Sequence, residues 1–384
     1  MKIPVLDLKQ QYQQIKTDID SALHQVLESS QFVLGPEVIK LEEEVAQYLG
    51  VKHAIGVNSG TDALIILLRA LNIGVGDEVI TTPFSFYATA ESISLVGAKP
   101  IFVDIDSDSF NLNPDLIKEV ITPQTKAIMP VHLYGQPAKM AQIVAIAQEY
   151  NLAIIEDCAQ AFGAKYYGDC LGCDQLCNQD ILKGKYVGGI GAGGAFSFYP
   201  TKNLGAYGDG GMIVTNDDHM AELAKMLRAH GSKKNYHNEM LGYNSRLDSI
   251  QATILRVKLK HIDKWNKARQ NIAKIYNQLL ANNSLIVTPQ YSQGHVFHQY
   301  TIKVTNGKRD QLKEYLAKND IGSMIYYPIP QDQLPVYENQ YQPQPVAMQL
   351  AQEVLSLPMY PELTPQHIET VAYTIIDWTK KYHN

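Results

Sequence analysis

The 384 residues carry a net charge of -6 and contain no run of lysine or arginine, which argues against a nucleic-acid or anionic-membrane partner. Hydrophobic residues make up 45% and charged residues 19% of the chain, as in ordinary globular proteins, and no apolar run is long enough to span a bilayer. The N-terminal residues lack the apolar core of a signal peptide, so we expect a cytoplasmic protein with reduced cysteines.

Helices are expected first at residues 15–29 and 37–49, and apolar strands then alternate with helices. The strands are expected at residues 53–57, 77–82, 99–105, 125–133 and 152–157. The helices between them are expected at residues 61–71, 88–97, 115–120 and 140–150. Continuous apolar strands separated by helices indicate a parallel sheet covered on both faces, and ligands of such sheets bind at the carboxyl ends of the strands.

The pattern changes near residue 246. A single long helix is expected at residues 248–280, followed by a strand at 298–304 and a helix at 309–319. We therefore expect a large domain of residues 1–250 and a smaller α+β domain of residues 251–384.

The stretch VNSGTDAL, residues 57–64, is a strand, a glycine turn and a helix start. Free backbone N–H groups and the helix dipole would bind a phosphate there, beside Gly60, and Ser59 and Thr61 would add hydroxyl donors. The alternative is a plain capping box of Ser59 with Asp62.

The stretch IIEDCAQAFGA places Asp157 at the end of an apolar strand, where a carboxylate can pair with a protonated ring nitrogen. The alternative is a helix-capping aspartate. Gln160 follows three residues later and reaches the same cavity if the segment turns helical. Cys158 is expected to pack as a small hydrophobe.

The stretch AFSFYPTKNLGAYGDGG places Lys202 between a strand and a glycine-rich loop, among aromatic and small residues rather than charges. A partly desolvated lysine has a lowered pKa and can form a Schiff base, although most lysines are surface residues. Ser197 precedes it and could reach the phosphate. Phe86, after another strand end, could stack on a flat cofactor or pack in the core.

These signals are specific in combination. A phosphate-binding turn, an aspartate for a ring nitrogen, a stacking ring and a Schiff-base lysine together describe a pyridoxal 5'-phosphate (PLP) site. At this point the sequence resembles the DegT/DnrJ/StrS-type PLP-dependent nucleotide-sugar aminotransferases, over nearly the whole chain. The resemblance rests on stretches that include LDLKQQY, VNSGTDAL, TTPFSFYATAE, IIEDCAQAFGA, FSFYPTKNLGAYGDGG and GYNSRLDSIQA.

The resemblance implies an α/β PLP-dependent transferase fold of the aspartate aminotransferase type, with a mostly parallel central sheet in the large domain and a smaller C-terminal α+β domain. It implies that Lys202 bonds to PLP and that Asp157 holds the pyridine nitrogen. Gln160 would lie by the phenolic oxygen of PLP, and Phe86 would stack on its ring.

The same resemblance implies that Gly60, Thr61 and Ser197 hold the phosphate. Asn244, in GYNSRLD, would complete that phosphate site from the neighbouring subunit. A homodimer with shared active sites is therefore implied.

The chain departs from the family in two places. Asp332 stands in YYPIPQDQLPVY where members often carry a histidine, which affects the sugar-side contacts. Roughly 15 extra residues, DCLGCDQLCNQDILK, hold three cysteines at positions 170, 173 and 177. A zinc site would need a fourth ligand that the sequence does not supply, so we expect no metal and a loop near the sugar-nucleotide entrance, with Lys183 or Lys185 available for a diphosphate.

The glycine run GIGAGG, residues 189–194, matches a dinucleotide-binding spacing without the required strand and helix, so we expect a flexible lead into the next strand.

The first functional hypothesis is transfer of an amino group from L-glutamate to a nucleotide-linked keto sugar. The sequences NSRLD and YPIP favour amination at the 3-position over the 4-position. The alternatives are a 4-keto sugar aminotransferase, a PLP-dependent sugar dehydratase and a non-catalytic PLP-binding regulator. Dehydratase relatives replace the lysine with histidine, so Lys202 argues against that alternative.

Overall fold

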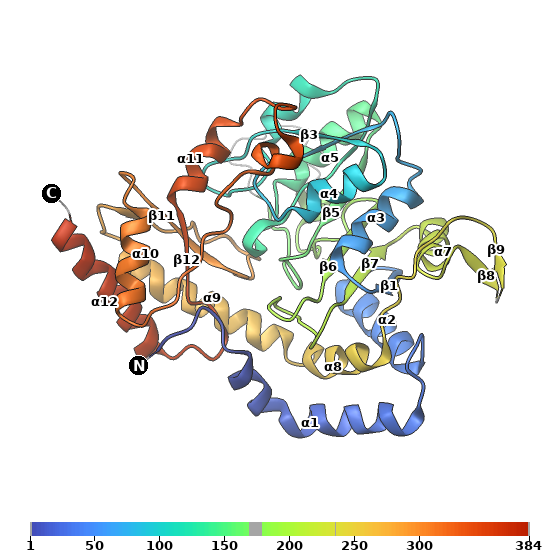
Figure 1. The fold of residues 1–384 in the computed structure, drawn as a ribbon, viewed down its shortest axis with the longest axis horizontal. Helices are drawn as coiled ribbons and strands as arrows, with labels where there is room; N and C mark the ends of the chain where they lie inside the picture. The colour runs from blue at the N-terminus through green and yellow to red at the C-terminus, as the bar shows by residue number, and fades with distance from the viewer. Residues whose placement is uncertain (1, 169–178, 235, 383–384) are drawn as a thin grey trace.

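The computed structural model describes residues 2–168, 179–234 and 236–382. A seven-stranded sheet lies at its centre, in the order β1-β7-β6-β5-β4-β2-β3 (Figure 1). Its strands are β1 (His53–Val57), β2 (Glu78–Thr81), β3 (Lys99–Phe102), β4 (Thr125–Ile128), β5 (Ala153–Asp157), β6 (Gly193–Ser197) and β7 (Gly211–Thr215). Only β7 runs antiparallel to its neighbours, so the expected mostly parallel sheet is confirmed.

Both faces of this sheet are buried, as the continuous apolar strands predict. In β7, Ile213 packs on one face with α3 (Gly60–Ala70) and α7 (Asp218–Leu227). Its neighbours Met212 and Val214 pack on the other face with α1 (Leu8–Ser29), α2 (Pro36–Leu49) and α8 (Ser249–Leu259). The remaining helices beside the large sheet are α4 (Ala88–Leu95), α5 (Met140–Tyr150) and α6 (Gln179–Leu182).

A second, three-stranded antiparallel sheet lies in the C-terminal part, in the order β10-β11-β12 (Figure 1). It consists of β10 (Ile286–Val287), β11 (Tyr300–Val304) and β12 (Val354–Leu357), and shares a core with α9 (Ile262–Leu280), α10 (Arg309–Lys318) and α12 (Pro365–Tyr382). Ile3 joins this core and pairs with Ile321, so the first residues of the chain pack with the last third. The proposed division at residue 250 remains a prediction.

The expected single helix over residues 248–280 is wrong, because the structure holds two helices, α8 and α9, with Lys260 and His261 between them. No proline or glycine marks this break in the sequence. The two halves are buried against different partners, α8 against α1 and α2 and α9 against α12. The change of direction is therefore a consequence of tertiary packing, which hydrophobic periodicity does not report.

Shorter elements complete the chain. The helix expected at residues 115–120 is a 3-10 helix, Pro114–Val120. The others are α11 (Pro345–Glu353), the hairpin β8 (Ser232–Lys234) with β9 (His237–Asn238), and 3-10 turns at Leu133–Gly135, Gln331–Gln333 and Pro335–Tyr337. None of the helices in the described ranges combines the length and hydrophobicity that a bilayer crossing requires.

Candidate functional site

The candidate residues follow strands that end at one edge of the large sheet. Strands β2, β5 and β6 are parallel, and β1 shares their direction because both β1 and β6 are antiparallel to β7. Asp157 ends β5, Ser197 ends β6 and Gly60 follows β1. The topology therefore gathers the sequence-predicted residues at the edge where parallel sheets bind ligands.

The start of α3 has the geometry of a phosphate cradle, and its role in phosphate binding stays a prediction. Ser59 caps the helix by accepting a hydrogen bond from the Asp62 N–H at 3.0 Å, so the capping interaction is present as well. The N–H groups of Gly60 and Thr61 have no acceptor within the helix. A Cβ atom on Gly60 would lie 2.7 Å from the Cβ of Ser197, so glycine lets the helix start approach that serine closely. Backbone donors and the two serine hydroxyls thus surround a site suited to an anion.

Asp157 is buried, with 4% of its surface exposed. Its Oδ2 accepts a hydrogen bond from Thr89 Oγ1 at 2.8 Å, and its Oδ1 accepts one from the Ala159 N–H at 3.1 Å. Burial raises the pKa of the Asp157 carboxyl, while these two hydrogen bonds and the charge of Lys202 act in the opposite direction. Sequence reasoning missed Thr89, although TTPFSFYATAE contains it.

Lys202 is close enough to Asp157 for their charges to interact. Burial lowers the pKa of the Lys202 ammonium to about 8, and the negative charge of Asp157 partly offsets this effect. The side chain is only partly exposed, in agreement with the expected desolvated lysine. Lys202 therefore sits where its amine can be uncharged near neutral pH, which nucleophilic chemistry requires.

The residue after Lys202 is held by a buried polar network. The Asn203 amide donates to Asn266 Oδ1 at 2.8 Å and to the Val296 carbonyl at 3.2 Å. Because its nitrogen is used in this way, its oxygen accepts a hydrogen bond from His298 Nδ1, at 3.1 Å. Burial lowers the pKa of His298 well below the ordinary value, so the ring is neutral. The network fixes the backbone that carries Lys202.

Gln160 and Phe86 meet a loop from the C-terminal part. The Gln160 Oε1 accepts a hydrogen bond from the Tyr134 N–H at 2.6 Å, and its Nε2 donates to the Tyr327 hydroxyl at 3.0 Å. The Phe86 ring is 58% exposed, and its centroid lies 6.3 Å from that of Tyr327. Phe86 is thus not a core residue, and its free face is available for stacking.

No hydrogen bond or ion pair of the described residues joins the Asn244 side chain to the other candidates. It is exposed, and its Oδ1 accepts a hydrogen bond from Arg246 at 2.5 Å. It follows the β8–β9 hairpin, which projects from the body of the molecule at the right of Figure 1. This placement is compatible with a contribution to another subunit and leaves that role a prediction.

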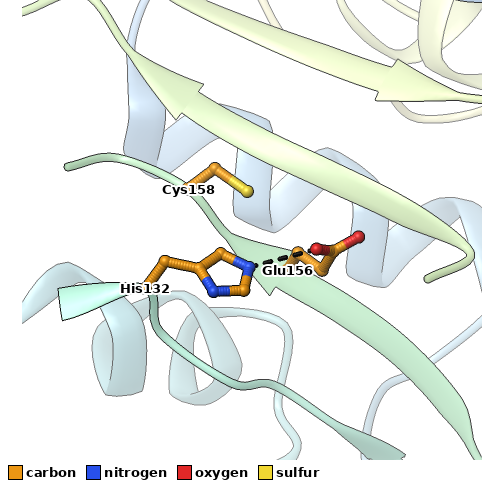
Figure 2. A group of neighbouring side chains, drawn as sticks. All are labelled: His132, Glu156 and Cys158. Carbon is orange, nitrogen blue, oxygen red and sulfur yellow. Dashed lines mark hydrogen bonds and ion pairs between the residues drawn. The ribbon is translucent and has the colours of Figure 1, made fainter. Parts of the chain in front are cut away.

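A second buried group, His132, Glu156 and Cys158, lies around β5 (Figure 2), with ligand atoms within 4.8 Å of one another. His132 Nδ1 accepts the Ala138 N–H at 3.0 Å, so the ring proton is on Nε2 and is donated to Glu156, also at 3.0 Å. Burial raises the pKa of the Cys158 thiol well above its usual value. The ring nitrogens of His132 and the carboxylate of Glu156 already form hydrogen bonds through the atoms that would bind a metal. This favours a packed polar cluster over a metal site.

Glu156 also anchors the glycine run. Its carboxylate accepts the N–H groups of Gly188, Ile190 and Gly191, each at 2.8 Å. A Cβ on Gly191 would lie 2.6 Å from the Ile154 carbonyl oxygen, so glycine is needed for this close approach. The prediction of a flexible lead is wrong: residues 188–191 form a turn tied to a buried carboxylate.

Asp332 is buried, and its Oδ2 accepts hydrogen bonds from Gln333 at 3.0 Å and from the Gln344 N–H at 3.3 Å. It is thus held within the C-terminal loop. The three cysteines of the insert lie outside the described residues. Lys183 and Lys185 follow the insert and are exposed, and the Lys185 carbonyl accepts the Tyr166 N–H at 2.9 Å. Their expected part in diphosphate binding stays a prediction.

The residues present fit PLP. The cradle that a Cβ at Gly60 would fill suits its phosphate, and the buried carboxylate of Asp157 suits a protonated ring nitrogen. Lys202, with its lowered pKa, suits covalent attachment. A single edge of the sheet thus carries all three chemical requirements.

Comparisons with known proteins agree with this geometry. Residues 13–376 match the DegT/DnrJ/EryC1/StrS aminotransferase family. A UDP-N-acetyl-3-dehydro-alpha-D-glucosamine 3-aminotransferase of Acidithiobacillus ferrooxidans is 45% identical over 97% of both chains. A protein of Geobacillus stearothermophilus named pleiotropic regulatory protein is 48% identical over the full length of both. The crystal structure of DesV from S. venezuelae, in complex with a ketimine intermediate, superposes with a TM-score of 0.92 at 39% identity, covering 98% of each chain.

Proposed function

This chain belongs to the DegT/DnrJ/EryC1/StrS aminotransferase family, whose members are PLP-dependent, and from that premise we propose that it moves an amino group from L-glutamate to the 3-keto group of a nucleotide-linked sugar. The observation that carries the proposal is that Lys202, whose pKa is lowered to about 8, lies within electrostatic range of the buried Asp157. Amination at the 3-position is supported by the Acidithiobacillus relative, which is named as a 3-aminotransferase.

In this proposal Asp157 holds the ring nitrogen of PLP in its protonated form, and Phe86 covers the ring. Gly60, Thr61 and Ser197 hold the phosphate through backbone and hydroxyl donors. PLP, when bound, supplies an electron sink for the carbanion formed at the donor's α carbon.

Lys202 has two tasks in this scheme. Its amine would hold the cofactor in the resting enzyme and would be released when the amino donor binds. The freed Lys202 amine then removes the proton from the α carbon of glutamate as a general base. A lysine with an ordinary pKa would be almost wholly protonated at neutral pH, so the desolvated setting of Lys202 matters for this step.

We further propose a homodimer in which the hairpin region of one subunit completes the site of the other. Apolar side chains at Leu27, Val33 and Ile39 are more than half exposed, as expected for an uncovered interface. A groove of about 750 Å³ beside the β8–β9 hairpin is lined by basic residues that include Lys225, Lys234 and Arg246. Positive charge next to Asn244 suits the diphosphate of a nucleotide sugar. We also propose a cytoplasmic location, which is consistent with these small-molecule partners.

A regulatory role is the second candidate, because the Geobacillus relative is named a pleiotropic regulatory protein. A non-catalytic regulator would need PLP only as a bound ligand. It would have no need of a lysine whose pKa is lowered to about 8 next to an aspartate. The sugar dehydratase alternative is disfavoured by the lysine itself, and the 4-keto alternative is decided by experiment.

The experiment supplies purified protein with PLP, nitrogen-15-labelled glutamate and a panel of 3-keto and 4-keto nucleotide sugars. Mass spectrometry should find the heavy nitrogen only in amino sugars formed from the 3-keto substrates. Label in the 4-keto sugars would select the alternative regiochemistry. Label in neither class, with PLP bound, would select the regulator.

A further inference from the structure

A short chain of buried hydroxyl groups is hydrogen-bonded to Asp157, and the proposed mechanism does not use it. Thr89 Oγ1 lies 2.8 Å from Asp157 Oδ2 and 2.9 Å from Ser85 Oγ. Thr89 is 1% exposed and Ser85 4% exposed, so water does not replace these contacts. A charged carboxylate only accepts hydrogen bonds, so Thr89 donates its single proton to Asp157. Ser85 must then donate to Thr89, and the chain has one direction.

This direction affects the charge of Asp157. A hydrogen bond donated to a carboxylate favours the charged form, whereas burial favours the neutral form. Only two donors reach the carboxylate within the described residues: the Thr89 hydroxyl at Oδ2 and the Ala159 N–H at Oδ1. The Ala159 donor belongs to the backbone. Lys202, His132 and Tyr327 are ionisable side chains that face this carboxyl, and the positive charge of Lys202 also favours its charged form. Thr89 is thus the side-chain hydrogen-bond donor that offsets the burial of Asp157.

The position of Thr89 is set from two sides. It lies in the first turn of α4, and the next residue, Ala90, donates its N–H to Gln331 Oε1 at 3.1 Å. Gln331 Nε2 also donates to the Thr82 carbonyl at 3.3 Å. Gln331, from the C-terminal part of the chain, therefore fixes the segment that orients the Thr89 hydroxyl.

We propose that Thr89, supported by Ser85, is a positioning residue that keeps the Asp157 carboxylate charged and oriented toward the ring nitrogen of PLP. The inference depends on the proposed function only in assuming that PLP binds beside Asp157. Without the Thr89 hydroxyl, Asp157 takes up a proton at a higher pH and loses its ionic bond to the pyridinium at that pH.

The test compares Thr89→Val, which keeps the shape and removes the hydroxyl, with Thr89→Ser, which keeps the hydroxyl. Ser92→Ala is the matched control: Ser92 is buried in the same helix, and its hydroxyl bonds to the Thr89 carbonyl at 2.9 Å without touching Asp157. PLP affinity is measured without substrates from pH 5 to 9 by quenching of intrinsic fluorescence.

For Thr89→Val we expect the acid-side loss of PLP affinity to move upward by about one pH unit, with roughly tenfold weaker binding on that limb. Thr89→Ser and Ser92→Ala should retain the native pH midpoint. In an Asp157→Asn background, Thr89→Val should produce no further midpoint shift, because the carboxyl on which Thr89 acts is gone. A Thr89→Val midpoint equal to the native one, or a loss of affinity that is uniform with pH, would overturn the proposal.

These outcomes are separable from failure of the proposed function. If no nucleotide sugar is aminated and the Thr89→Val midpoint still moves, the role of Thr89 stands. If sugars are aminated and the midpoint does not move, only the role of Thr89 falls.

Discussion

Glu156 and Asp157 are consecutive residues of β5, and their carboxylates serve opposite faces of the sheet. Glu156 binds the turn at residues 188–191, while Asp157 accepts the hydroxyl proton of Thr89. The alternation of side chains along a strand produces this separation. The end of β5 thus binds a turn through Glu156 on one face of the sheet and places the Asp157 carboxyl in the site on the other face.

Glu156→Gln should destabilise the protein, because the amide nitrogen cannot accept from the N–H groups that now bind the carboxylate. Each N–H left without an acceptor costs roughly 1–3 kcal/mol. Urea denaturation measures the loss. The control is Glu149→Gln, an exposed residue that forms an ion pair with Lys118. A midpoint unchanged relative to that control would contradict the anchoring role.

Asp157→Asn should leave the protein folded and able to bind some PLP, and should slow the glutamate half-reaction on the order of 10²–10³-fold. The amide cannot stabilise a positive charge on the ring nitrogen. Single-turnover absorbance with glutamate is the measurement, with exposed Asp218→Asn as the control. A native rate would mean that Asp157 serves only as a structural acceptor for the Thr89 hydroxyl and the Ala159 N–H.

Lys202→Ala should abolish transamination while circular dichroism stays native, because the change removes a partly exposed side chain and leaves the surrounding core in place. The matched control is Lys264→Ala, an exposed lysine on α9. Turnover of glutamate at the native rate by the Lys202 variant would refute its assignment.

The pH dependence of Lys202 in cofactor-free protein gives an independent check. Burial disfavours the charged ammonium, so the reactive amine should reach half its maximum near pH 8, against about 10.4 for a lysine side chain in a model peptide. Asp157→Asn should move the Lys202 midpoint lower still, since the aspartate charge raises it. Competitive labelling followed by mass spectrometry measures both. A Lys202 midpoint equal to that of the model peptide would contradict the desolvated setting.

Asn244→Ala should weaken PLP retention by roughly 1.5–3 kcal/mol, the worth of a hydrogen bond to a charged group. If Asn244 acts in the partner's site, mixing this variant with Lys202→Ala should restore part of the activity, since one site of each mixed dimer has both native residues. No recovery, with subunit exchange shown by mass, would place Asn244 outside the shared site.

The sequence predicts the strands and helices of the large sheet well, because each apolar run is long and bounded by turns. Helix α5 begins and ends where periodicity places it, at Met140 and Tyr150. The break at Lys260 was not predictable, because it arises from packing against helices remote in sequence. The anchored turn at residues 188–191 was missed for a similar reason, since its acceptor, Glu156, lies in another strand.

The candidate site shows the same limit. Residues that touch a ligand occupy strand ends and can be found one motif at a time. Thr89 cannot be found in this way, because its partner Asp157 is 68 positions further along the chain. Tyr327 reaches Gln160 across 167 positions. Supporting contacts of this kind become visible only when the chain is folded.

The most direct test asks which lysine carries PLP. Lys202 has a competitor in Lys258, a buried residue whose pKa is also lowered, to about 7, and whose Nζ donates to the Gly205 carbonyl at 2.6 Å. Borohydride reduction of the PLP-loaded protein makes the bond between PLP and lysine permanent, and peptide mass spectrometry locates it. We predict the adduct on Lys202 in at least most of the protein. An adduct on Lys258, or on any other lysine, with Lys202 unmodified would contradict the account.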